Sequence, residues 1–257
     1  MELIQTLKKF YKTNKRDLPW RHTHDPYKIL VSEVMLQQTQ VERVVPKYKA
    51  FLKEFPTVSQ LAKAPLSQVL REWQGLGYNR RGKFLHQAAK VIAKDGWGGK
   101  LPGVGPYTRA AIEAFAYNKQ VVFIETNIRT VFTHFYFPNK SGVSDADLLL
   151  LIEQDFKKSK MEPRDFYAAL MDYGSYLKRS GIKINKQSKH YTKQKKFEGS
   201  ERQLRGAILR ELLKKPQTVH ALTKSLSKEK EKVAQLLARL VVERLIQKEG
   251  SRYVVAD

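Results

Sequence analysis

The stretch LPGVGPYT at residues 101–108 decides how the rest of the chain is understood. Gly103 and Gly105 leave backbone N–H groups bare, and Pro106 suits a first helical turn because its missing N–H would be unpaired there anyway. A phosphate fits such a helix N-terminus, whose dipole favours negative charge. An ordinary tight turn explains the glycines equally well. The stretch alone therefore predicts a turn and a helix, and its surroundings must decide whether an anion binds there.

Composition narrows the class of partner. The chain has 257 residues, 42% of them hydrophobic, which is enough for a substantial core and roughly one to three domains. Lys and Arg number 48 against 25 Asp and Glu, giving a net charge of +23. Such a surface favours a polyanion, because contact with phosphates releases counterions. A membrane surface is the competing partner, but the sequence has no long uncharged apolar run, so nucleic acid is favoured and no membrane contact is expected.

The absence of cysteine limits the possible metal and disulfide chemistry, and the N-terminal residues indicate the cellular compartment. The sequence contains no cysteine, which excludes disulfides, thiolate zinc and any cysteine-ligated iron–sulfur cluster. Residues 1–11 carry neither an apolar core of signal-peptide length nor a small-residue cleavage site. We therefore expect a cytoplasmic, nucleoid-associated protein.

A second stretch, residues 26–36, predicts a helix buried on most sides. Asp25 is a plausible N-cap, Pro26 suits the first turn, and the apolar residues that follow are nearly continuous. Glu33 interrupts them. A buried carboxylate is costly unless it is paired or working, and burial raises a carboxyl pKa toward the range useful for proton transfer. The alternative is that Glu33 faces water.

Residues 31–41, VSEVMLQQTQV, resemble the signature of the MutY-type adenine DNA glycosylases nearly residue for residue. LPWR at 18–21, DPY at 25–27, FPT at 55–57 and GLGY at 75–78 resemble the same family in the same order. LPGVG followed by an acid that heads its own helix is similar to the helix-hairpin-helix DNA glycosylases, the superfamily of endonuclease III. The resemblance covers roughly residues 5–180 and implies an all-α helix-hairpin-helix glycosylase fold.

The resemblance also implies three catalytic positions. The glutamate at the position of Glu33 donates a proton to N7 of adenine and then handles the attacking water. Tyr107 stands where superfamily members that also cleave the backbone carry a lysine able to form a Schiff base, so base excision without strand cleavage is expected. Glu125 stands where the family has aspartate, and a carboxylate there would stabilise the oxocarbenium-like sugar. The alternative for Glu125 is a helix-terminal acid that balances the dipole of a helix at 127–137.

Further residues are expected, from the same resemblance, to contact DNA or the flipped base. They are Trp20, Arg21, Leu36, Gln37, Gln38, Thr39, Tyr78, Gly103, Val104, Gly105 and Thr108. Trp20 and Arg21 would lie beside the adenine pocket, and the amides of Gln37 and Gln38 suit contacts with base edges. On sequence grounds Tyr78 is nearly as well explained as a core or surface aromatic. No metal and no cofactor are expected, apart from a conceivable monovalent cation held by carbonyls of the hairpin.

The chain departs from the family between residues 56 and 100. Short helices are predicted at 57–64, 66–73 and 78–94, and most of the basic residues Arg80, Arg81 and Lys83 fit a solvated face. Residues 95–100 then lead straight into LPGVG, so about one short helix of the usual hairpin motif is missing. The four cysteines that normally follow residue 180 are absent. A run with six lysines, Lys183 to Lys196, stands in their place; it is either solvated or a replacement contact to the DNA backbone.

The last part of the chain predicts a separate small module. Helices near 201–214, 218–226 and 229–247, followed by a strand at 252–255, are typical of a winged-helix-like domain. This module either binds duplex DNA or serves in dimerisation or packing. The predicted domains are therefore the glycosylase domain 1–182, a basic linker 183–199 and the winged-helix-like domain 200–257.

Together these features predict a monomeric, monofunctional glycosylase that hydrolyses the N-glycosidic bond of mispaired adenine in double-stranded DNA, opposite 8-oxoguanine or guanine, after flipping the nucleotide out. Residues 200–257 do not resemble the family's usual C-terminal domain, which recognises 8-oxoguanine, so the opposing base stays open. One alternative is a thymine or uracil mismatch glycosylase of the same superfamily. Another is a catalytically silent winged-helix DNA-binding regulator, against which the two retained carboxylates argue.

Overall fold

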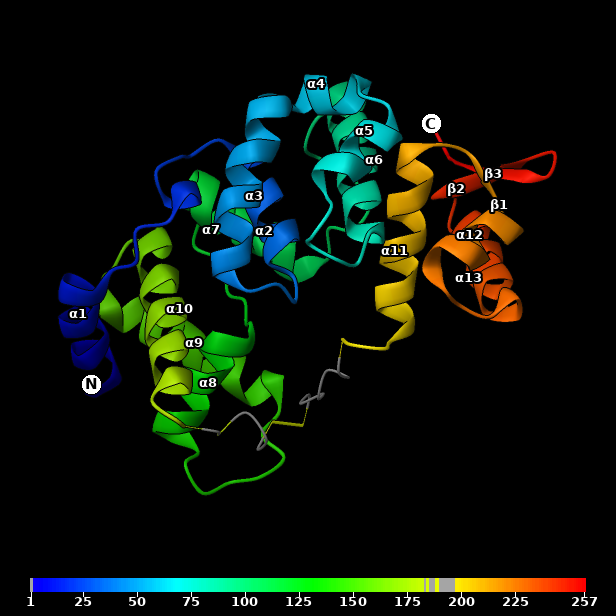
Figure 1. The fold of residues 1–257 in the computed structure, drawn as a ribbon. Coiled ribbons are helices and arrows are strands. Elements are labelled where there is room, and N and C mark those ends of the chain that lie inside the picture. Colours follow the sequence, from blue (N-terminus) through cyan, green and yellow to red (C-terminus); the bar gives the residue numbers. More distant parts are fainter. Residues whose placement is uncertain (1, 183, 185–187, 190–196) are drawn as a thin grey trace. The chain divides into compact units, whose positions relative to one another are not determined.

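The structure is a computed structural model in which residues 2–182, 184, 188–189 and 197–257 are described. These residues form 13 α-helices, one short 3-10 helix and a small sheet (Figure 1). In chain order the elements are α1 (Glu2–Asn14), η1 (Pro19–Arg21), α2 (Pro26–Leu36), α3 (Val41–Glu54), α4 (Val58–Lys63), α5 (Leu66–Glu72), α6 (Arg80–Asp95), α7 (Pro106–Tyr117), α8 (Thr126–Tyr136), α9 (Asp145–Ser159), α10 (Pro163–Arg179), α11 (Glu201–Lys214), β1 (Gln217–Thr218), α12 (Val219–Leu226), α13 (Lys230–Val242), β2 (Ile246–Glu249) and β3 (Arg252–Val255). The predicted helical fold class is confirmed. None of the described helices combines the length and apolar character needed to cross a membrane.

The chain divides into two compact units that interleave in sequence. Unit 1 comprises Met1–Leu30 and Gly105–Lys193, and unit 2 comprises Val31–Val104 and Gln194–Asp257. The boundary falls within α2, so this one helix contributes residues to both units. As predicted, Asp25 caps its start, because the backbone N–H of Tyr27 donates to Asp25 Oδ1 at 2.8 Å.

Unit 1 is built on the crossing of α8 and α10. Ile128, Val131 and Phe132 of α8 are fully buried in a core that also takes side chains of α1, α7 and α9. Gly174 of α10 permits the close approach, because a Cβ there would lie 2.3 Å from the carbonyl oxygen of Asn127. The two helix backbones are therefore in contact at the first turn of α8.

Unit 2 contains α3 to α6 and all of the elements after residue 200. Trp73, which follows α5, is fully buried and packs edge-on against Phe51. Its indole lies against Gly82 of α6, where a Cβ would come within 2.9 Å of the ring. The indole N–H donates to the carbonyl of Gly77 at 3.1 Å, so this tryptophan also fixes the turn that precedes α6.

The C-terminal module, residues 200–257, has three helices and a three-stranded antiparallel sheet in the order β1-β3-β2. The winged-helix-like assignment of this module stays a prediction. One prediction is wrong: the helix expected near 229–247 ends at Val242, and Ile246–Glu249 form a strand. Arg244 adopts a positive φ of 53°, and Leu245 is fully buried under the turn. Pairing with β3 then outweighs helix propensity.

The module is attached to α5 and α6 within unit 2. Arg71 of α5 donates to the carbonyl of Leu213 at 3.2 Å, and Lys83 of α6 donates to the carbonyl of Glu243. The predicted domain boundaries stay a prediction. Most of the predicted linker 183–199, including most of the lysine run, lies outside the described residues.

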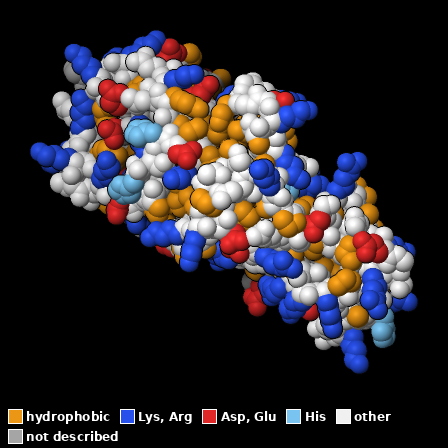
Figure 2. Space-filling model, turned by 90° about the horizontal axis from the view of Figure 1, so that it is seen from above, with side chains coloured by type: hydrophobic (Ala, Val, Ile, Leu, Met, Phe, Trp, Pro, Cys, Tyr) orange, Lys and Arg blue, Asp and Glu red, His pale blue; other side chains and the backbone are white. Residues whose placement is uncertain are grey.

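Residues 96–105 join α6 to α7 without an intervening helix, as the short sequence predicts. Gly103 has a φ of +71°, and a Cβ there would lie 2.7 Å from the Cβ of Phe84. The hairpin therefore rests directly on α6. Groups of lysine and arginine side chains are scattered over the face seen in Figure 2, with fewer acidic ones among them, in keeping with the net charge of +23.

Candidate functional site

Glu33 lies on α2 and is 5% exposed. Its neighbours Ser32 and Val34 are also buried, so the alternative of a solvated glutamate is excluded for this position. A buried carboxyl on a rigid helix has a fixed direction, which a proton donor needs. The environment is therefore suited to the role that the sequence predicts, although that role stays a prediction.

The turn after Glu33 is held by Arg81 of α6. Its two terminal nitrogens lie 2.6 to 3.2 Å from five backbone carbonyl oxygens and the Thr39 hydroxyl. The carbonyls belong to Val34, Met35 and Gln37 at the end of α2, and to Leu76 and Gly77 in the turn before α6. A helix end carries unsatisfied carbonyls and negative dipole charge, both of which a cation stabilises.

Arg81 is the functional residue that sequence reasoning missed. It was expected on a solvated face, but it is 9% exposed, and burial lowers its pKa to about 10. At that value it stays protonated at neutral pH. Lys83 is buried as well, whereas Arg80 is exposed. The available signal was the spacing: Arg81 follows the GLGY turn by three residues and lies on the same helical face as Leu85 and Ala88, which are buried.

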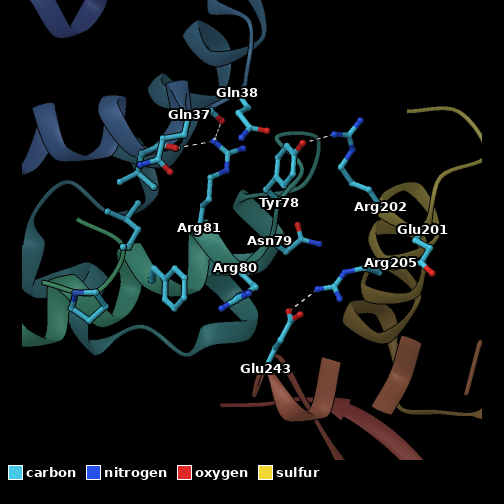
Figure 3. Close-up of a pocket in the computed structure, with 15 residues that line it drawn as sticks. Gln37, Gln38, Tyr78, Asn79, Arg80, Arg81, Glu201, Arg202, Arg205 and Glu243 are labelled. Atoms are coloured by element: carbon cyan, nitrogen blue, oxygen red, sulfur yellow. Dashed lines mark hydrogen bonds and ion pairs between the residues drawn. The ribbon is translucent and has the colours of Figure 1, made fainter. Parts of the chain in front are cut away.

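Tyr78 lies between two guanidinium groups. The Cζ of Arg81 is 5.5 Å from its ring centroid and the Cζ of Arg202, on α11, is 5.0 Å away. Arg202 also donates a hydrogen bond to the Tyr78 hydroxyl (Figure 3). Each cation–π contact contributes about 0.5 to 2 kcal/mol, more when it is shielded from water. Tyr78 is thus a half-buried ring in a fixed orientation, and not a core aromatic.

A cavity of about 660 Å³ opens beside this ring. We call it the Tyr78 cavity. It is lined by Gln37, Gln38 and Tyr78 and, from the C-terminal module, by Arg202, Arg205 and Glu243 (Figure 3). Gln38 adopts a positive φ of 57°, a conformation that costs energy for a residue with a side chain and that the Arg81 contacts hold in place.

The structure therefore brings one group of predicted site residues together in unit 2. Leu36 ends α2, Gln37 and Gln38 form the turn, Thr39 donates weakly to the carbonyl of Leu76 at 3.5 Å, and Tyr78 lies beside them. Gly103 and Val104 also belong to unit 2. The others, Trp20, Arg21, Gly105, Tyr107, Thr108 and Glu125, belong to unit 1.

Arg21 in unit 1 is bound to a buried carboxylate. It donates to both oxygens of Asp172, at 2.7 and 2.8 Å, and Arg16 donates to the same group. Burial alone would raise the pKa of Asp172, but the hydrogen bonds and charge of Arg21, aided by Arg16, hold it below the ordinary value. This ion pair fixes η1, and with it Trp20, against α10.

Glu125 caps helix α8. Its Oε1 accepts the backbone N–H groups of Asn127 at 2.7 Å and Ile128 at 2.9 Å. Lys178 of α10 donates to Asn127 Oδ1 at 2.7 Å; burial lowers the pKa of this lysine, and Glu125 opposes the shift. The capping alternative from the sequence is thus present in the structure. It is compatible with catalysis, since a capped carboxylate has a fixed position.

The start of α7 carries the hairpin residues. Gly105 is the N-cap and Pro106 opens the helix, as predicted. The backbone N–H of Val104 already donates to the carbonyl of Leu101 at 3.2 Å, so it is engaged in the turn itself. Tyr107 packs edge-on against Phe123 with ring centroids 5.7 Å apart, and Thr108 is buried. A phosphate or a cation at this turn stays a prediction. Within the described ranges, no cluster of three His, Asp or Glu side chains is placed to hold a metal.

Comparisons with known proteins give the family. Residues 31–153 match the HhH-GPD superfamily of base excision DNA repair proteins. The adenine DNA glycosylase of Mycolicibacterium smegmatis is 38% identical over 179 residues, which are 65% of this chain and 60% of that protein. The thymine/uracil-DNA glycosylase of Methanothermobacter thermautotrophicus is 29% identical over 185 residues, 68% of this chain and 83% of that protein. The structure of a thermostable thymine-DNA glycosylase is similar with a TM-score of 0.57 at 29% identity, covering 67% of this chain and 84% of that one.

The chain matches only part of its adenine-acting relatives: 60% of the M. smegmatis protein and 40% of that from Buchnera aphidicola. The matched region nevertheless contains the second half of α2, the Arg81 contacts and α8. The chain therefore contains, over residues 31–153, a domain of the HhH-GPD superfamily of base excision DNA repair proteins, and adenine DNA glycosylases are among its homologues.

Proposed function

We propose that the protein is a monofunctional adenine DNA glycosylase acting on a mispaired adenine in duplex DNA. The observation that carries the proposal is the buried Glu33, placed on a rigid helix directly before the Gln37–Thr39 turn that Arg81 holds. The similarity to adenine DNA glycosylases at 38% identity supports the same substrate class. The excess of 48 basic over 25 acidic residues supports a polyanionic partner.

In this proposal Glu33 acts twice. Its proton passes to N7 of the flipped adenine, the C1′–N9 bond breaks, and the bonding electron pair leaves with the base. The sugar is left as an oxocarbenium-like cation, which the carboxylate of Glu125 stabilises. Water then adds to C1′ and returns a proton to Glu33, so adenine and an abasic sugar are the products and no strand is cut.

A thymine or uracil glycosylase is the second candidate, because the thymine/uracil-DNA glycosylase relative is matched over 83% of its length. The Gln37-Gln38-Thr39 turn favours adenine, since it belongs to the stretch that resembles the adenine-specific family. Tyr107 is compatible with both candidates, so substrate turnover is the measurement that separates them.

The test is a panel of duplex oligonucleotides bearing A:8-oxoG, A:G, T:G and U:G, treated with alkali after incubation and scored for strand breaks at abasic sites. Breaks in the adenine strand of the first two are expected. Breaks found only at the T or U that lies opposite guanine would instead support the thymine or uracil glycosylase. No break in any duplex would favour a silent DNA-binding protein.

Borohydride trapping tests the monofunctional chemistry separately. Tyr107 cannot form a Schiff base, so the wild-type protein should give no covalent adduct with a substrate duplex. A trapped adduct would mean that a lysine elsewhere attacks C1′. Strand breaks at abasic sites should accordingly appear only after alkali. Breaks without alkali would also mean that a lysine elsewhere attacks C1′.

A further inference from the structure

A second cavity, of about 380 Å³, is lined by α6 and the C-terminal module within unit 2. We call it the His86 cavity. Its titratable side chains are Lys83, His86 and Lys90 of α6 and Arg244 and Asp257 of the module. Leu66, Val241 and Ile246 are among its apolar side chains. Sites for small molecules measure about 300 to 1,000 Å³, so this volume suits a small ligand.

Three cations face the His86 cavity against one carboxylate. None of the ion pairs found in the described part of the chain includes Lys83, Lys90 or Arg244. The carboxylate of Asp257 is held by Ser67, whose backbone N–H and hydroxyl donate to it at 2.7 and 2.9 Å. The cations therefore repel one another, and an anion among them would relieve that repulsion.

Lys83 shows the effect of this crowding. It is 9% exposed and donates to the backbone carbonyl of Glu243. Burial lowers its pKa, the charges of Arg244 and Arg80 lower it further, and Glu243 opposes the shift. The carboxylate of Glu243 is itself paired with Arg205 at 2.6 Å. An anion beside Lys83 would therefore offset a repulsion that the neighbouring acid leaves in place.

The ring of His86 has an unused hydrogen-bonding position. The residue is 3% exposed, and its Nε2 is buried with no hydrogen-bond partner in the described part of the chain. Backbone hydrogen bonds with Ala62 and Ala64 engage the ring, and they fall on Nδ1 because Nε2 has none. Burial, reinforced by Lys90, lowers the pKa of His86, although these bonds and Asp257 oppose the shift. The ring is therefore neutral at neutral pH, and its Nε2 is an acceptor that needs a donor.

The ligand that satisfies both features is an anion that also carries an O–H group. The cations call for negative charge, and the buried Nε2 calls for a donor. A phosphate monoester has a second pKa of about 6, so near neutral pH it keeps its charge and has a proton available for Nε2. Sulfate and the phosphodiesters of DNA have the charge without such a proton. The apolar side chains of the cavity suit the organic part of an ester.

We propose that the His86 cavity binds a phosphate group that carries a proton, as inorganic phosphate or a small phosphate monoester. Lys83, Lys90 and Arg244 hold its oxygens, and His86 Nε2 accepts its O–H. The cavity shares none of its lining residues with the Tyr78 cavity, and the inference does not depend on the proposed function. Because the ligand touches both α6 and the module, its binding should fasten one to the other.

Arg244→Gly removes one of the cations without weakening the fold. Arg244 is exposed and has a φ of 53° directly after the C-cap of α13, where glycine is favoured because it has no Cβ. Lys160→Gly is the matched control, since Lys160 is an exposed cation in unit 1 with the same φ. Both variants should melt at or above the wild-type temperature, so a loss of binding in Arg244→Gly is not a loss of folding.

A second pair of variants lies on α6. Lys90 and Lys94 are both exposed, but only Lys90 lines the cavity. Lys90→Gln is therefore compared with Lys94→Gln. Isothermal titration calorimetry near neutral pH measures the binding of inorganic phosphate, ribose 5-phosphate and sulfate to each protein, and melting curves record the effect of each ligand on stability.

The wild type and both controls should bind phosphate about tenfold or more tightly than sulfate, and phosphate should raise their melting temperatures. Arg244→Gly and Lys90→Gln should bind phosphate about tenfold more weakly than their controls do. Tighter binding of ribose 5-phosphate than of inorganic phosphate would identify an ester as the occupant, and the reverse order would identify the free ion.

Equal affinity of the wild type for phosphate and sulfate would overturn the proposal, because Nε2 would then select nothing. Equal phosphate affinity of Arg244→Gly and Lys160→Gly would overturn it as well. Fluorescence anisotropy with duplex DNA covers the remaining explanation of the cations. If Arg244→Gly loses more duplex affinity than Lys160→Gly while its phosphate binding is unchanged, Arg244 is a contact to the DNA backbone and the proposal is wrong.

Discussion

Glu125 stands where the resemblance to the MutY-type glycosylases implies a catalytic aspartate. Both backbone hydrogen bonds of the α8 cap go to Oε1, while Oε2 accepts the Asn127 side-chain amide at 3.3 Å, so a glutamine can keep the two backbone hydrogen bonds while losing the charge. We expect Glu125→Gln to unfold at nearly the wild-type urea concentration but to excise adenine about a hundredfold more slowly, since a well-placed charge in a dry site is worth about 3 kcal/mol. Single-turnover kinetics check the excision rate, and urea titration of the same samples checks the stability.

Glu125→Asp tests whether the backbone has adapted to the longer side chain. Aspartate restores the family's residue, and its shorter arm still reaches the N–H groups of a helix start. If α8 has shifted to accept glutamate, the aspartate variant will be slower than wild type. If Glu125→Gln excises adenine at a rate close to wild type, Glu125 only caps helix α8 and takes no part in catalysis.

Arg81 is the residue on which the geometry of the turn depends. A lysine has three donors and no planar fork, so Arg81→Lys must leave some of the carbonyls of Val34, Gln37 and Leu76 without a charged partner. We expect a loss of about 2 kcal/mol in the free energy of unfolding and a lower affinity for substrate duplex. Arg80→Lys, next to it but exposed, should behave as wild type; equal effects of the two changes would contradict the assigned role.

At the scale of elements, the close crossing of α8 and α10 sets the position of Glu125. A methyl group at Gly174 would overlap the Asn127 carbonyl, two residues after Glu125. Gly174→Ala should therefore destabilise the protein by about 2 kcal/mol or more and slow excision. Gly206→Ala on α11 meets nothing within 4 Å and should stabilise by up to about 1 kcal/mol through helix propensity. Melting temperatures of the two variants, moving in opposite directions, are the check.

The elements also show where sequence patterns succeed. The buried apolar run before Glu33 and the glycine-flanked turn before Pro106 predicted α2 and α7 correctly, because their burial and capping are local. The helix expected at 229–247 was too long, because Ile246–Glu249 pair with a strand that follows them. Strand pairing depends on a partner elsewhere in the chain, which periodicity alone does not reveal.

At the scale of the molecule, the same limit applies to the site. Sequence resemblance pointed to Glu33, the Gln37–Thr39 turn and Tyr78 as site residues, and all of them belong to unit 2. It missed Arg81 and Arg202, because their partners are backbone carbonyls and aromatic rings contributed by distant segments. The attachment of the C-terminal module to α5 and α6 could not be predicted either, since its hydrogen bonds join residues far apart in sequence: Arg71 to Leu213, Lys83 to Glu243 and Ser67 to Asp257.

A buried histidine makes the stability of unit 2 depend on pH. His86 is 3% exposed, and burial, reinforced by Lys90, lowers its pKa below 6.5 against the opposing effect of backbone hydrogen bonds. Below that pH the unfolded chain binds a proton that the folded protein does not, so stability is full above it and falls as the pH drops. Urea midpoints at about pH 7.5 and about pH 5.5, on either side of the ordinary histidine value, should show this loss. It should shrink in His86→Gln and persist in His220→Gln, an exposed control on α12.

The central claim is that Glu33 supplies the proton for adenine excision, and Glu33→Gln tests it most directly. The amide is nearly the same shape but cannot donate and recover a proton, so substrate binding should stay within about threefold of wild type while no abasic sites form in a single turnover. Glu42→Gln, at an exposed acid on α3, should excise at the wild-type rate. Abasic sites formed by Glu33→Gln at a rate close to wild type, measured on an A:G duplex with enzyme in excess, would contradict the account.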